Sequence, residues 1–70
     1  MERDKMKDSL YELIVQSLRD SKPEKSRPYD DIYHSMLVQW NLTCENFAYY
    51  LSGNYAGFNR NEFLRAVGYG

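Results

Sequence analysis

The sequence predicts a small all-α domain built as a bundle of three helices. Apolar residues recur at intervals of three and four in three segments, at about residues 8–20, 29–52 and 59–67. Prolines and glycines fall between these segments, and no segment shows the apolar–polar alternation typical of a strand. At 70 residues the chain forms one domain, spanning residues 1–70. It lies near the lower size limit for folding without metals or disulfides.

The first helix is expected at about residues 8–20. Ser9 and Glu12 have the spacing of a capping box, and Asp4 or Asp8 are alternative, earlier caps. The inward face of this helix is expected to carry Leu10, Ile14, Ser17 and Leu18, with Leu13 beside them. The linker that follows, residues 21–28, contains Pro23, which stops the first helix, and Pro28, which suits the first turn of the next.

The second helix is expected at about residues 29–52, with a length of about 35 Å. Its apolar residues keep helical spacing throughout: Ile32, Tyr33, Met36, Leu37, Trp40, Cys44, Phe47, Ala48 and Leu51. Because this pattern crosses residues 41–43 in phase, one continuous helix is preferred. The alternative is a break between Asn41 and Thr43, with Thr43 capping a separate helix and four helices in all. Gly53 is expected to end the helix.

The third helix, at about residues 59–67, has recognisable signals at both ends. Asn59 and Glu62 form a capping box, and Phe58 and Phe63 are placed as a hydrophobic staple. At the C-terminal end, Gly68 can adopt the left-handed conformation, and Tyr69 can fold back onto Leu64 in a Schellman motif; Phe63, Leu64 and Val67 form the apolar face.

The simplest packing places the first helix antiparallel to the first half of the second helix. The last helix then folds back across the second half. Such a core is thin, and one side of the bundle is left apolar, which favours self-association into a homo-oligomer.

Composition limits the classes of function. Nine basic and ten acidic residues leave a net charge of −1, without the basic surplus typical of nucleic-acid binders. A single cysteine excludes an internal disulfide framework and fits a reducing compartment. Neither a membrane span nor a signal peptide is evident, so we expect a cytoplasmic protein that does not act at a membrane.

No catalytic, metal or cofactor site is expected. His34 and Cys44 are the only histidine and the only cysteine, and on one helix they lie about 15 Å apart along its axis, too far for a nucleophile–base pair. Asp30, Asp31 and His34 offer too few ligands for a closed zinc site. No glycine-rich loop is followed by Lys and Ser or Thr, as phosphate binding requires.

Five residues are candidates for contacting a partner: Tyr49, Tyr50, Tyr55, Arg60 and Arg65. Exposed tyrosines near a short loop are suited to contacting another protein, although they could equally complete a small core. Arg60 and Arg65 on the last helix, beside Asn59 and Asn61, also suggest a helix-turn-helix that reads DNA. Against this interpretation, the loop at residues 53–58 is longer than the usual turn, and the net charge is unfavourable.

The chain resembles a group of small helical proteins encoded by bacteriophages, prophages and plasmids, which end in a Phe-Asp-Arg-x-x-Phe signature. The matching residues are Tyr11-x-x-Ile14-Val15-x-x-Leu18, Trp40, Phe47-Ala48-x-x-Leu51, Asn54 and Phe58-Asn59-Arg60-x-x-Phe63-Leu64-x-x-x-Gly68. Here Asn59 replaces the usual Asp, and Val67 replaces a common Cys. The group has no assigned activity; the resemblance implies an accessory protein of a mobile element inside a bacterial cell.

These observations together favour a non-enzymatic protein that binds another protein, either a host or defence factor or a second copy of itself. A DNA-binding regulator using the C-terminal helix is the alternative.

Overall fold

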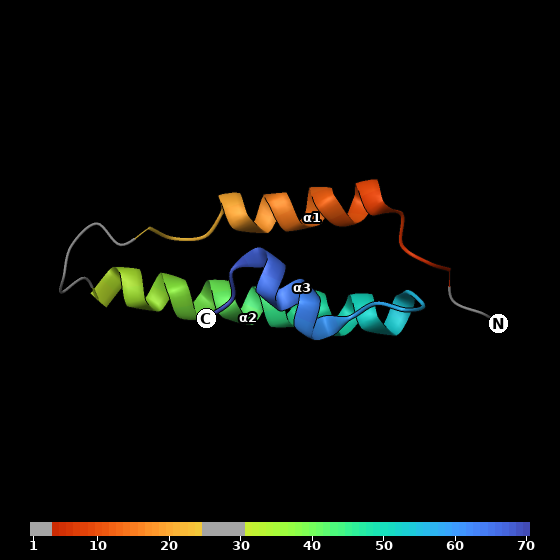
Figure 1. The fold of residues 1–70 in the computed structure, drawn as a ribbon. Helices are drawn as coiled ribbons and strands as arrows, with labels where there is room; N and C mark the ends of the chain where they lie inside the picture. The colour runs from red at the N-terminus through yellow and green to blue at the C-terminus, as the bar shows by residue number, and fades with distance from the viewer. Residues whose placement is uncertain (1–3, 25–30) are drawn as a thin grey trace.

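The computed structural model describes residues 4–24 and 31–70 and consists of three α-helices (Figure 1). They are α1 (Asp8–Asp20), α2 (Asp31–Asn54) and α3 (Arg60–Val67). The expected all-α bundle of three helices is confirmed. The expected helix start near Tyr29, the role of Pro28 and the second half of the linker lie outside the described residues.

Helix α2 is continuous across residues 41–43, so the alternative with four helices is wrong. It also runs two residues beyond the expected end, because Gly53 adopts helical geometry and the helix continues to Asn54. The Asn54 side-chain amide donates a 2.7 Å hydrogen bond to the Tyr50 carbonyl, which satisfies one of the last acceptors of the helix. Gly57, with φ of +74°, makes the left-handed turn that redirects the chain toward α3.

The start of α1 differs from the capping boxes expected for it. The capping position is occupied by Lys7, in extended geometry and without a side-chain capping bond, and Ser9 lies inside the first turn. The preceding segment is anchored elsewhere, since the Ala56 amide donates to the Asp4 carbonyl at 3.0 Å. A tertiary contact therefore holds the segment before the helix, and Asp8 places its charge in the first turn.

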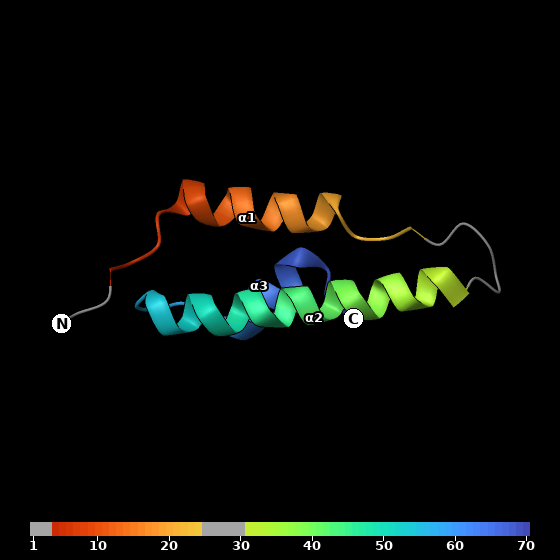
Figure 2. The same cartoon turned by 180° about the vertical axis from the view of Figure 1, so that it is seen from behind.

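Helices α1 and α2 lie side by side and antiparallel, with α3 packed against both (Figures 1 and 2). The start of α1 lies beside the end of α2 through the Asp4–Ala56 bond, and its last turn reaches Trp40. Helix α1 therefore covers the second half of α2, together with α3, and the expected placement over the first half is wrong. The molecule is elongated, measuring 49 × 19 × 14 Å.

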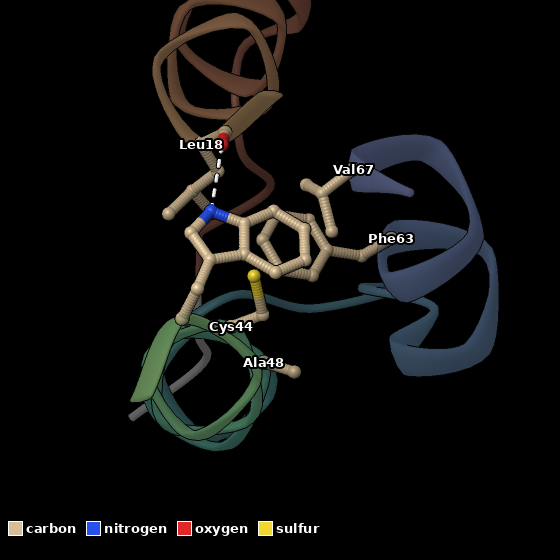
Figure 3. Packing of buried hydrophobic residues seen from close by; sticks show 6 residues of the cluster. Leu18, Cys44, Ala48, Phe63 and Val67 are labelled. Atoms are coloured by element: carbon tan, nitrogen blue, oxygen red, sulfur yellow. Dashed lines mark hydrogen bonds between the residues drawn. The ribbon is translucent and has the colours of Figure 1, made fainter. Parts of the chain in front are cut away.

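The core is small and lies where the three helices converge. Its buried residues are Leu18 of α1, Trp40, Cys44 and Ala48 of α2, and Phe63 and Val67 of α3 (Figure 3). The centre of the Phe63 ring also lies 6.1 Å from the centre of the Tyr11 ring and 5.3 Å from that of Phe58. Helix α3 thus packs against one side of both other helices, and it covers many of their buried side chains.

The ends of α3 match the sequence signals. Asn59 Oδ1 accepts a 2.9 Å hydrogen bond from the Glu62 amide. The contact between the Phe58 and Phe63 rings is the expected staple. Gly68 has a φ of +85°, and the Tyr69 amide donates to the Leu64 carbonyl at 3.0 Å, as in a Schellman motif.

Several residues expected in the core are exposed instead. They are Leu10, Leu13, Ile32, Met36 and Phe47. The face of α1 that packs on the core carries Tyr11, Ile14, Val15 and Leu18, so it is rotated from the expected one. The reason is the position of α3, which packs against the side of α1 that carries Tyr11 and Val15. The side with Leu10 and Leu13 is left uncovered.

Candidate protein-interaction surfaces

The three helices are held in register around the indole of Trp40. Its Nε1 donates a 2.9 Å hydrogen bond to the Leu18 carbonyl, an acceptor in the last turn of α1, drawn as a dashed line in Figure 3. Lys22 Nζ lies 5.2 Å from the centre of the Trp40 ring and donates to the Gly68 carbonyl. One aromatic side chain of α2 thus joins the C-terminal ends of α1 and α3, which fixes the surfaces around them.

Two of the three candidate tyrosines are exposed. Tyr49 and Tyr50 retain 66% and 64% of their accessible surface, and their rings meet edge to face at 5.3 Å. Tyr55 is half-buried in the loop after α2. Since Tyr50 lies about 200° around α2 from Ala48, which faces α3, Tyr50 points away from α3.

The two candidate arginines are exposed but lie about 140° apart around α3, because five residues separate them. Arg60 lies near Tyr69, whose hydroxyl donates a 2.7 Å hydrogen bond to Glu45 of α2. That bond raises the pKa of Tyr69, and the charge of Arg60 lowers it in part. The five candidate residues therefore do not form one surface: Tyr50 and the arginines lie on different sides of the molecule.

His34 and Cys44 lie on the same continuous helix, as expected, and the fold does not bring them together. Cys44 is fully buried between α2 and α3, and burial raises the pKa of its thiol, an effect that Lys22 partly offsets. His34 is exposed. Within residues 4–24 and 31–70, no group of three or more His, Cys, Asp or Glu residues is placed to hold a metal ion.

A surface that the sequence analysis missed runs along the side of α2 opposite Trp40. Val38, Leu42 and Tyr49 lie about 160–200° around the helix from Trp40, and they are 45%, 49% and 66% exposed. We call these three residues the outer stripe. The signal was present in the sequence, because Asp31 and Glu45 are the only charged residues among the 24 of α2. A surface helix normally carries many more charges on its outer face; here Asp31 and Glu45, at about 180° and 140° from Trp40, are the two that α2 places there.

A second apolar surface is a groove between α1 and α2 with a volume of about 310 Å³. We call it the α1–α2 groove; it is lined by Leu13, Ile14, Ser17, Leu18, Ser21 and Phe47. No residue of α3 lines it. Figure 2 shows the molecule from the side on which α1 and α2 lie in front of α3. Leu13 at its rim is 68% exposed.

A third depression, of about 330 Å³, lies between the N-terminal segment, the loop before α3 and the first turn of α3. Lys5, Asp8, Tyr11, Asn59 and Glu62 are among the residues that line it. Burial raises the pKa of Tyr11, and the charge of Glu62 adds to the effect. Asn59 is already used as the cap of α3.

Comparison of the chain with protein-family models, with curated proteins and with solved structures finds no match. Among the described residues, none of the helices combines the length and the apolar character needed to cross a bilayer.

Proposed function

We propose that this protein is a non-enzymatic binding protein that contacts a protein partner through the outer stripe of α2. The observation that carries the proposal is the exposure of Val38, Leu42 and Tyr49 on a helix with only two charged residues. Interface centres are enriched in aromatic side chains, and Tyr49 supplies one here, while Glu45 beside the stripe is engaged by the Tyr69 hydroxyl. Tyr49 is both the most exposed residue of the stripe and a residue type common at binding hot spots.

The spacing of the stripe suggests how the partner is engaged. Val38 and Leu42 stand at positions i and i+4, two of the anchor positions on a helix that lies in an apolar groove of its partner, and Tyr49 lies two turns beyond Leu42 on the same side. Helix α2 is held rigid by the Trp40 hydrogen bond and by α3, so little ordering entropy is lost on binding. We infer that α2 is the element presented to the partner.

The resemblance to proteins of phages, prophages and plasmids suggests the setting. In that setting the protein is a mobile-element accessory protein acting in the bacterial cytoplasm, and its partner is a host factor or a defence protein.

The alternative, a DNA-binding regulator using α3, has weaker support. Recognition by one helix requires its basic side chains to share a face, whereas Arg60 and Arg65 diverge by about 140°. Arg60 also lies close to the Tyr69–Glu45 pair, which places a negative charge near it.

Affinity capture from bacterial lysate, with mass spectrometry of the retained proteins, tests the proposal. The wild-type chain should retain a defined protein, and Leu42→Lys should lose it, because it places a charge in the centre of the stripe. Leu13→Lys is the matched control, since it makes the same change at an exposed leucine on α1. Retention of DNA that salt removes, with no protein retained, would overturn the proposal and favour the regulator.

A further inference from the structure

We propose that the α1–α2 groove is the contact surface of a symmetric homodimer, occupied by a second copy of this chain. The outer stripe lies on another side of α2, so the dimer goes beyond the proposed function and leaves its surface accessible.

The groove lies on a side of the α1–α2 pair that no third helix covers among the described residues. Helix α3 covers one side of the α1–α2 pair, while the other side leaves Leu13 68%, Met36 52% and Phe47 39% exposed. The groove volume of about 310 Å³ is roughly twice that of an engineered cavity of about 150 Å³ that binds benzene. It can therefore accept large apolar side chains from a facing surface.

Removing water from the groove should also cost little free energy. The residues that line it carry no charge. The Ser21 hydroxyl at one end donates to the Leu18 carbonyl, and the Thr43 hydroxyl beside the groove donates to the Gln39 carbonyl. Since these polar groups already have partners within the chain, covering them with apolar side chains costs little.

A ridge suited to fill such a groove lies next to it on α2. Gln39, Thr43 and Phe47, which also forms the α2 wall of the groove, stand at positions i, i+4 and i+8, and Tyr50, which is 64% exposed, lies beside the end of this row. Rows of residues four apart are the ridges that pack into grooves between helices. In a twofold dimer the ridge of each copy faces the groove of the other.

Charge and size favour a second copy as the occupant. In a twofold interface residue i of one copy meets residue j of the other, and j meets i, so the ridge and the groove must suit each other. Neither the ridge nor the groove lining carries a charge that a second copy would have to bury unpaired. The broad 49 × 19 Å face of the molecule is on the order of 900 Å², against about 800 Å² that each partner buries in a stable interface. Dimerisation also supplies the burial that so small a core lacks.

Sedimentation equilibrium of the full chain over a range of concentrations tests the proposal. The wild type should sediment as a dimer, with twice the 8.3 kDa mass of the chain. Leu13→Lys should sediment at half that mass with an unchanged far-UV circular dichroism spectrum, because the residue is exposed in the single chain. Leu42→Lys, the matched change on the outer stripe, should remain a dimer.

Cysteine cross-linking tests the same contact without disturbing the packing. Ser17→Cys, inside the groove, mixed with Thr43→Cys, on the ridge, should form a covalent dimer of the two variants on mild oxidation, because the ridge of one copy faces the groove of the other. Glu12→Cys, exposed on α1 and absent from the groove lining, should not cross-link to Thr43→Cys. The native Cys44 is fully buried and does not interfere.

Three outcomes would overturn the homodimer. They are a monomeric wild type at every concentration, a dimer that Leu13→Lys leaves intact, and cross-linking at residue 12 but not at residue 17. A monomeric wild type whose captured protein is lost in Leu13→Lys would assign the groove to another protein. Capture that depends on Leu42 would survive any of these results, so the homodimer and the proposed function can fail separately.

Discussion

At the scale of single residues, the chain uses its two most unusual core positions, Trp40 and Cys44, for packing rather than for chemistry. The Trp40 indole ties the end of α1 to α2 and supports Lys22, which in turn bonds the end of α3. The Cys44 thiol lies fully buried beneath these contacts. A buried thiol in apolar surroundings is inert, whereas a catalytic one is partly exposed and electropositive.

Cys44 should therefore be protected from thiol reagents in the native protein. At pH 8 we expect labelling to be about 10²–10³-fold slower than in denaturant, since reaction requires an opening that costs about 3–4 kcal/mol. Labelling kinetics with a chromogenic disulfide, with and without guanidinium, measure this factor. Equal rates in the two conditions would contradict the buried position.

The raised pKa of Cys44 also fixes the direction of a pH effect. Because the folded state favours the protonated thiol, its contribution to stability is complete below the ordinary pKa of 9.0 and is lost as pH rises above it. Urea midpoints measured on either side of pH 9 should fall more steeply for the wild type than for Cys44→Ala.

Replacing each of two glycines by alanine should change the stability of the protein in opposite directions. Gly53 is exposed inside α2, and nothing lies within 4 Å of an added Cβ, so Gly53→Ala should stabilise by about 0.5–1 kcal/mol. Gly68 has a φ of +85°, where a side chain is strained, so Gly68→Ala should destabilise by about 1 kcal/mol or more. Thermal melts at one protein concentration should shift by roughly 4–8 °C per kcal/mol, upward for the first and downward for the second.

At the scale of elements, α3 is the clearest case of local sequence specifying local structure. With 8 residues it is too short to persist alone, yet its cap, staple and left-handed glycine are all formed. Helix α1 is the opposite case. Its expected caps are not at the capping position, and the segment before it is held by the Asp4–Ala56 hydrogen bond.

The cap of α3 should be measurable by substitution. Asn59→Ala removes the acceptor of the Glu62 amide and should cost about 1 kcal/mol. Asn59→Asp, which retains an acceptor and restores the residue common in the resembling proteins, should match or exceed wild-type stability. Urea denaturation followed by circular dichroism compares the three proteins; equal midpoints for wild type and Asn59→Ala would show that the cap contributes nothing.

At the scale of the whole molecule, α3 joins two helices that have few direct contacts with each other. Much of the burial of α1 and α2 is shared with Phe63 and Val67, which are 0% and 1% exposed. Loss of the α3 side chains should therefore unfold the entire chain rather than release α3 alone. The elongated shape leaves little other core to compensate.

Phe63→Ala should abolish most of the cooperative fold. Removing a buried phenylalanine costs about 3–5 kcal/mol, while a 70-residue domain has only about 4–10 kcal/mol in total. Far-UV circular dichroism should show the loss of helix or a melting temperature lowered by at least about 12 °C. Arg65→Ala, an exposed residue of the same helix, is the control and should melt as the wild type does.

The sequence by itself determined the three helices, the continuity of α2 and both ends of α3, because spacing, caps and glycine geometry are local properties. Of the face expected for α1, only Ile14 and Leu18 lie on the observed core face. The outer stripe was not predicted, because the exposure of Val38 and Leu42 beside Tyr49 depends on which side of α2 the other helices cover.

Only the tertiary structure decided which flank of each amphipathic helix is buried. Both flanks of α1 are apolar, so periodicity alone does not show whether the Tyr11 side or the Leu13 side is buried. Packing against α3 and the Trp40–Leu18 hydrogen bond bury the Tyr11 side. The same contacts placed α1 over the second half of α2 and left the α1–α2 groove open. Helix caps and hydrophobic periodicity are local properties of the sequence. Contacts between helices depend on how the separate helices pack together, which no local pattern specifies.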